Sequence, residues 1–202
     1  MQNFVPRLKD HLLSRLLNRD YDGDETSFSN DDRNTVRIID NRIYSAKVLR
    51  VNYTTYDIRR DQDSMNPRTH CDIMVLSRET ESDAHPYWYA RVLGVFHIRV
   101  LHTGPAAKNR SVQHMEFLWV RWFGRVAGHR YGFKAARLPK IGFIEETDDL
   151  AFGFLDPSLV LRGCHIIPAF ADGRTQALLK APLTAARPPG ESDDWVAFYV
   201  NM

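Results

Sequence analysis

The fold is decided by two aromatic runs, His85-Pro86-Tyr87-Trp88-Tyr89-Ala90-Arg91-Val92-Leu93-Gly94-Val95-Phe96 and Glu116-Phe117-Leu118-Trp119-Val120-Arg121-Trp122-Phe123-Gly124-Arg125. Both are rich in the β-branched and aromatic residues that favour strands. A connector with turn-forming Gly, Pro, Asn and Ser separates them, so the pattern predicts two neighbouring antiparallel strands. Two such strands bring several rings together on one surface. That surface suits the binding of a cation, a base or a peptide better than bond-breaking chemistry.

Shorter strand signals lie on both sides of these runs. Val, Ile, Leu and Tyr dominate 35–58, 71–76, 158–168 and 195–202, whereas 59–70, 77–84 and 126–140 are polar and are predicted to be loops. Many short strands with little helix predict a mostly β barrel or sandwich with peripheral loops.

Three parts are expected along the chain. A helix and an acidic loop occupy 1–34, a β domain occupies 35–180, and a Pro-rich mobile linker with a terminal strand occupies 181–202. The terminal run ends without a polar tail, which is typical of a fragment of a longer protein.

The first part contains an amphipathic helix over 6–18. Leu8, Leu12 and Leu16 recur every four residues, and a basic face lies opposite them. The preferred interpretation is a helix docked on the domain through its leucines. A partner-binding arm is the alternative.

An acidic segment without Lys or Arg follows at 20–32. Asp20, Asp22 and Asp24 alternate as at the start of an EF-hand calcium loop. However, Glu25 occupies the sixth place, where the turn needs Gly, and Asp31 replaces the usual Glu at the twelfth. We therefore expect a solvated acidic loop rather than a calcium site.

The composition fits an ordinary globular protein. The 202 residues carry a net charge of +2, which is too small to identify a partner. No apolar run approaches the roughly 20 residues of a membrane span, and no signal peptide is evident. We expect an intracellular chain without a membrane partner.

The two cysteines exclude a disulfide framework and favour a reducing compartment. Each has a histidine neighbour, in His70-Cys71 and Cys164-His165. Adjacent residues on a strand point to opposite faces, so neither pair chelates a metal easily. The sequence predicts buried thiols and no zinc site.

Catalytic motifs are equally scarce. The chain lacks a glycine-rich phosphate loop, a Gly-x-Ser-x-Gly elbow and a His-Glu-x-x-His pair. Asp57, Asp61 and Asp63 resemble a metal-dependent nuclease cluster only weakly, and an exposed loop explains them better. We expect no enzyme activity, no metal and no cofactor.

A basic segment over 117–144 contains no acidic residue, and rings are interleaved with its cations. The candidates for nucleic-acid binding are Arg121, Arg125, Arg130, Lys134, Arg137 and Lys140. Clustered cations beside rings are typical of surfaces for nucleic acid or acidic proteins. Two alternatives stay open: Arg121 caps the sheet rim, and the loop charges pair with the acidic turn at 145–149.

Three strand motifs, in their order, resemble a BAH (bromo-adjacent homology) domain. Trp88-Tyr89-Ala90-Arg91-Val92 resembles the family's aromatic-x-Ala/Gly-Arg-Ile strand. Val120-Arg121-Trp122-Phe123-Gly124-Arg125 resembles its Val-x-Trp-Phe-x-Arg strand. Leu161-Arg162-Gly163-Cys164-His165-Ile166 resembles its Ile-x-Gly-Lys-Cys strand without the Lys. The resemblance covers about 71–170 and implies a BAH-like β-barrel.

Other stretches resemble fungal proteins encoded by or derived from DNA transposons, the Plavaka-type group. They are Phe4-Val5-Pro6-Arg7-Leu8-Lys9, Arg50-Val51-Asn52-Tyr53-Thr54-Thr55-Tyr56-Asp57 and Phe152-Gly153-Phe154-Leu155-Asp156-Pro157. This second resemblance spans nearly the whole chain and implies a transposon-related nuclear protein.

The BAH resemblance implies a non-enzymatic chromatin module, because some members hold a methylated lysine in an aromatic cage. It places Trp122 at a cage position, with Trp88 as a second wall and Phe123 as a further candidate. Gly124 stands where some cage-bearing members have another ring. The implied partner is a histone tail, a nucleosome or another chromatin protein. The alternatives are a DNA-binding accessory domain of a transposase and, for Trp122, a place in the core.

Overall fold

The computed structural model describes residues 3–19, 27–55, 57–80 and 85–201, and a large antiparallel sheet dominates it. The helices are α1 (Phe4–Leu16) and α2 (Asn30–Asn34), with 3-10 turns η1 (Phe133–Ala135), η2 (Pro157–Leu159) and η3 (Phe170–Asp172). The strands are β1 (Val36–Ala46), β2 (Leu49–Thr54), β3 (Arg60–Met65), β4 (Asp72–Leu76), β5 (Tyr87–His102), β6 (Gln113–Arg125), β7 (Lys140–Phe143), β8 (Phe152–Leu155), β9 (Val160–Gly163), β10 (His165–Pro168), β11 (Arg174–Thr175), β12 (Asp194–Trp195) and β13 (Phe198–Asn201). The predicted mostly β class is confirmed.

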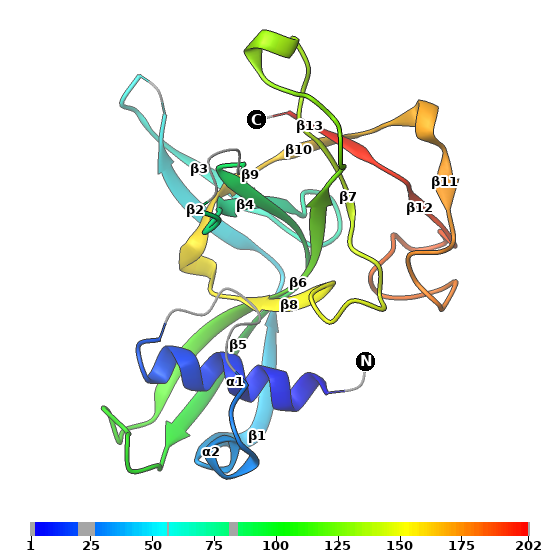
Figure 1. Cartoon of the computed structure of the whole chain (residues 1–202). Helices are drawn as coiled ribbons and strands as arrows, with labels where there is room; N and C mark the ends of the chain where they lie inside the picture. Colours follow the sequence, from blue (N-terminus) through cyan, green and yellow to red (C-terminus); the bar gives the residue numbers. More distant parts are fainter. Residues whose placement is uncertain (1–2, 20–26, 56, 81–84, 202) are drawn as a thin grey trace.

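The two aromatic runs form the long central strands β5 and β6, which pair antiparallel as predicted. Tyr89 lies opposite Phe123 and Ala90 opposite Trp122, while Val100 lies opposite Gln113 at the other end. β5 and β6 run from the end of the molecule that carries α1 into its opposite half (Figure 1). They therefore connect the two halves of the protein, and each half carries one of the surfaces described below.

Helix α1 docks on one end of these strands through its leucines. Leu8, Leu12 and Leu16 are buried in one cluster with Phe117 of β6 and Ile98 of β5. Figure 1 shows the helix crossing in front of the strands. The structure confirms the docked-helix interpretation, since burial of each leucine contributes about 1.5–3 kcal/mol.

The sheet follows the order β10-β13-β7-β6-β5-β4-β9, with β1 paired to β5 and β8 paired to β6. Its two edge strands, β9 and β10, are joined through Cys164 alone. No pairing between them closes the sheet in the described part of the chain. The segment predicted as one strand over 158–168 is thus two strands on opposite edges, and the predicted closed barrel is not observed.

Strand β3 corrects the loop predicted over 59–70. It pairs with β2, from Leu49 opposite Met65 to Thr54 opposite Arg60. Its sequence, Arg-Asp-Gln-Asp-Ser-Met, is polar because most of its side chains are exposed. The hydrophobic pattern therefore gives no strand signal, and backbone hydrogen bonds to β2 hold it in place.

Asp40 and Asn41 form an irregularity inside β1. Both residues have positive φ, 57° and 50°, and the register with β5 shifts between Ile38 and Ile43. Asp and Asn tolerate this left-handed conformation better than most residues. Strand β1 therefore continues along β5 through the bulge.

The acidic segment is described only in part, because 20–26, with Asp20, Asp22, Asp24 and Glu25, lie outside the described residues. In its described part, the short helix α2 begins at Asn30 with Ser29 as its N-cap, which the sequence did not predict. Ser29 and Asp32 form a reciprocal capping box. Arg33 of α2 pairs with Asp10 of α1 at 2.6 Å, which ties the two helices together.

The C-terminal part differs from the predicted mobile linker. Arg187 and Asp194, within 181–194, are both buried. Strand β13 lies between β10 and β7 of the main sheet. The reason is an ion-pair network with β6, described below, which the prolines and glycine of this segment do not predict.

No described helix is long and apolar enough to cross a membrane.

Candidate functional site

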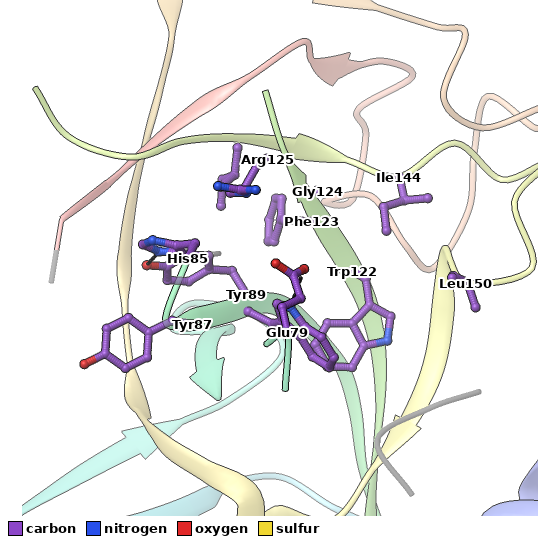
Figure 2. Close-up of a pocket in the computed structure, with 12 residues that line it drawn as sticks. Glu79, His85, Tyr87, Tyr89, Trp122, Phe123, Gly124, Arg125, Ile144 and Leu150 are labelled. Carbon is purple, nitrogen blue, oxygen red and sulfur yellow. Dashed lines mark hydrogen bonds between the residues drawn. The ribbon is translucent and has the colours of Figure 1, made fainter. Parts of the chain in front are cut away.

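A ring-lined pocket of about 390 Å³ lies where β5 begins and β6 ends (Figure 2). This is within the size range of small-ligand sites. We call it the aromatic pocket. Its lining residues are Glu79, His85, Tyr87, Trp88, Tyr89, Trp122, Phe123, Gly124, Arg125, Ile141, Ile144 and Leu150. It brings together all three rings proposed from the sequence.

Trp88 and Trp122 are neighbours because of the strand register. Ala90 lies opposite Trp122, and Trp88 is two residues from Ala90 on the same face of β5. The two indole centroids are 6.3 Å apart, with their planes at 81°. Perpendicular rings at this separation form two walls of a corner.

The two walls differ in how firmly they are held. Trp88 is half-buried, whereas Trp122 is only 7% exposed and belongs to a core cluster. Gly153 of β8 lies against Trp122, and a Cβ there would be 2.8 Å from the indole Nε1. Trp122 therefore serves the core and the pocket together, while Trp88 packs against the same cluster from a half-buried position.

Phe123, the third candidate ring, is committed mostly to the core. It is 6% exposed, stacks on Phe143 at 4.2 Å and meets the edge of Phe198 at 5.7 Å. These contacts come from β7 and β13 and leave little of the ring for a ligand. Phe123 closes the pocket rather than forming a wall.

Glu79 supplies a carboxylate that sequence reasoning missed. Its Oε1 accepts a hydrogen bond from the Trp88 indole Nε1 at 3.1 Å. Figure 2 shows the carboxylate between Phe123 and Trp122, pointing into the pocket. Glu79 lies in a polar stretch predicted as a loop, so no pattern marked it. The rings thus have an anionic group beside them.

His85 fixes the other side of the pocket. It is buried, and its ring nitrogens contact the hydroxyls of Tyr131 at 3.0 Å and Tyr89 at 2.8 Å. Burial, reinforced by the charge of Arg125, lowers the pKa of His85. The ring is therefore neutral at neutral pH, donating through one nitrogen and accepting through the other. Sequence reasoning did not single out this trio.

The structure corrects the assignment of Arg121 to a nucleic-acid surface. Its side chain is 0% exposed, and its Nη1 lies 2.8 Å from Asp194 Oδ1. Arg187 binds the other oxygen of Asp194 at 2.9 Å. The Arg121 guanidinium also lies 3.8 Å from the centroid of the Phe143 ring. Arg121 therefore holds the C-terminal segment to β6 and faces no solvent.

The remaining cations of the basic segment separate into two groups. Lys140 is half-buried and pairs with Asp172 at 2.6 Å, so its charge is already compensated. The other candidates are exposed: Arg125, Arg130, Lys134 and Arg137. In the part of the chain that is described, no ion pair joins Arg130, Lys134 or Arg137 to the acidic turn at 145–149, as the alternative required.

Both cysteines are half-buried, whereas the sequence predicted buried thiols. Burial raises the pKa of Cys71 to about 11 and that of Cys164 to about 12, so both stay protonated at neutral pH. Both are free. Among the described residues, no group of three or more His, Cys, Asp or Glu side chains is arranged to hold a metal ion. Asp61 and Asp63 lie on β3, and Asp63 accepts a hydrogen bond from the Gly163 backbone.

Comparison with protein-family models, curated proteins and solved structures finds no match to this chain. The resemblance to BAH domains therefore rests on the three strand motifs themselves.

Proposed function

We propose that the protein is a non-enzymatic interaction module that captures a methylated lysine side chain in the aromatic pocket. The single observation that carries the proposal is the corner of Trp88 and Trp122 with the Glu79 carboxylate beside it. Rings present the negative faces of their π-systems, which attract a cation. A carboxylate next to them adds direct charge attraction and raises the preference for a cationic ligand.

The pocket is electrically asymmetric, which gives the ligand a direction. In Figure 2, the Phe123 ring lies between Arg125 and Trp122. The Glu79 carboxylate lies on the Trp122 side of that ring. A methylammonium group fits the end with Trp122 and Glu79. The end with Arg125 suits an acceptor, such as a carbonyl or carboxylate of the same peptide. The volume of about 390 Å³ accommodates one side chain and part of its backbone.

The proposed setting is chromatin. The BAH-like strand motifs and antiparallel sheet support a BAH-like architecture, and in that family aromatic cages bind modified histone tails. We therefore propose a histone tail or other chromatin protein as the partner, in a nuclear, transposon-related protein. The alternative, a DNA-binding accessory domain of a transposase acting through 125–137, has Arg130, Lys134 and Arg137 in its favour, because they are exposed.

Trp88→Ala tests the pocket directly. We expect it to weaken binding of a trimethyl-lysine peptide about tenfold, because one good ring contact with a quaternary cation contributes roughly 0.5–2 kcal/mol. Since Trp88 is half-buried, the variant should keep its fold. Titration calorimetry with methylated and unmethylated forms of the same peptide measures the effect.

The matched control is Trp195→Ala, which removes an indole that lies outside the pocket and contacts Arg174. Its affinity should equal that of the unaltered protein. Glu79→Gln should also weaken binding, with the aromatic walls intact. Equal affinity for both forms of the peptide, or equal losses in the Trp88 and Trp195 variants, contradicts the proposed function.

A further inference from the structure

Positive charge gathers on two stretches that sequence reasoning did not connect, 36–50 and 97–116. These stretches contain seven Lys or Arg residues and two acidic residues, so their net charge is +5, whereas that of the whole chain is +2. All seven are exposed: Arg37, Arg42, Lys47, Arg50, Arg99, Lys108 and Arg110. The rest of the chain is therefore net negative, and the small total charge hides a strongly basic region.

The strand register brings these stretches onto one face of the β1–β5–β6 sheet. Tyr44 lies opposite His97, and His97 lies opposite Glu116. Arg99 lies opposite His114. Directly paired residues of antiparallel strands share a face, so these side chains lie together.

The other face of the same strands is already covered. Ile98, Val100 and Phe117 alternate with the residues just named and are buried in the cluster with the α1 leucines. Figure 1 shows α1 crossing this end of β1, β5 and β6. The face with Tyr44, which we call the basic ring face, is thus the side away from the helix.

Three rings form a row across the strands. The Tyr44 ring stacks on His97, with centroids 5.1 Å apart and planes at 19°. The His97 ring lies 4.8 Å from His114. Tyr44 is 36% exposed at the end of this row. A flat ligand can continue the stack on the side of Tyr44 away from His97.

Few of the cations around the rings are paired with a carboxylate. In the residues that the structure describes, only Arg99 among the seven makes an ion pair, with Asp40 at 3.6 Å, and both side chains are about half exposed. Arg50 borders two hollows of about 430 and 360 Å³, one lined by His114 and the other by His97. Positively charged side chains and surface hollows therefore lie together beside the row of rings.

We propose that the basic ring face binds single-stranded nucleic acid, a function separate from the aromatic pocket. The arginines and lysines contact phosphates, and a base stacks on Tyr44. Single strands are favoured over duplexes because only an unpaired base offers its flat face to a protein ring. The 125–137 segment, with Arg125, Arg130, Lys134 and Arg137, is the competing basic surface.

The test compares two triple variants that remove equal charge. One replaces Arg37, Arg42 and Arg99 by Ala, and the other replaces Arg130, Lys134 and Arg137 by Ala. Fluorescence anisotropy measures binding of a labelled thymidine strand of about 15 nucleotides at several salt concentrations. Each lost phosphate contact makes the salt slope shallower by about 0.7, so the face variant should lose about two units of slope. The loop variant should keep the original slope.

Tyr44→Ala separates stacking from charge. It should weaken binding of the labelled strand about tenfold while leaving the salt slope unchanged, since stacking does not release counterions. Circular dichroism confirms that each variant keeps its fold, and methylated-peptide binding in the face variant stays at its original value.

Three results overturn the inference. The first is loss of binding in the loop variant alone, which assigns nucleic acid to 125–137. The second is tighter binding of a matched duplex than of the single strand. The third is equal binding of polyglutamate, which indicates a surface for acidic proteins instead.

Discussion

Replacing Asp194 by alanine should destabilise the protein by about 3–5 kcal/mol, because it leaves two buried arginines without their carboxylate. The side chains of Arg121 and Arg187 are both 0% exposed, and Asp194 contacts each of them within 3 Å. Arg187 also donates to the carbonyls of Ala181 and Pro182, so the whole 181–194 segment depends on the network. Urea unfolding followed by tryptophan fluorescence measures the free energy of unfolding.

Asp193→Ala is the matched control, since it makes the same chemical change at the adjacent residue. Asp193 pairs with Arg174 at 2.7 Å, but both side chains are about one-third exposed. Such a pair contributes about 0–1 kcal/mol. A loss of less than about 1 kcal/mol in both variants contradicts the buried network.

Acidification should produce the second large effect, through His11 of α1. Its side chain is 0% exposed, and burial, with Arg15 adding to it, lowers the pKa of His11 to about 3. The unfolded chain binds the proton near pH 6.5, well before the folded protein does. The contribution of His11 to the free energy of unfolding is therefore fully present above about pH 6.5, and it is lost as the pH drops toward 3. Between about pH 7 and pH 4.5 this one group accounts for about 2–3 kcal/mol.

His11→Gln isolates this contribution, because glutamine keeps a polar side chain but does not titrate. We expect the difference in unfolding free energy between the two pH values to shrink by about 2–3 kcal/mol in this variant. His165→Gln, at an exposed position, should leave the difference unchanged. An identical pH dependence for the unaltered protein and His11→Gln shows that His11 is not the titrating group.

The parts of the fold that could be predicted are those where hydrophobic pattern and position agree. The α1 leucines and the β5 and β6 runs are buried on one or both faces, so the sequence shows their periodicity. Strand β3 could not be predicted in this way because its side chains are mostly exposed. The break at Cys164 and the anchoring of 181–194 depend on distant partners, which local pattern does not encode.

The candidate site was predictable in its rings and not in its polar groups. Trp88 and Trp122 follow from two strands placed in register. Glu79 comes from a segment without periodicity, and only the folded chain brings it to the pocket. The same holds for Tyr131, which contacts the pocket residue His85. Arg121 failed as a surface candidate because its partner, Asp194, is 73 residues away in the sequence. A strand position alone cannot tell a cation that faces solvent from one that is paired inside.

The central claim, that the aromatic pocket holds a methylated ammonium group, is tested most directly by the four tryptophan indole N–H signals in a two-dimensional NMR spectrum. Titration with a trimethyl-lysine peptide should shift the signals of Trp88 and Trp122. Trp119, packed against α1, and Trp195, beside Arg174, should not move. Unchanged Trp88 and Trp122 signals at saturating peptide, or shifts confined to Trp195, contradict the account.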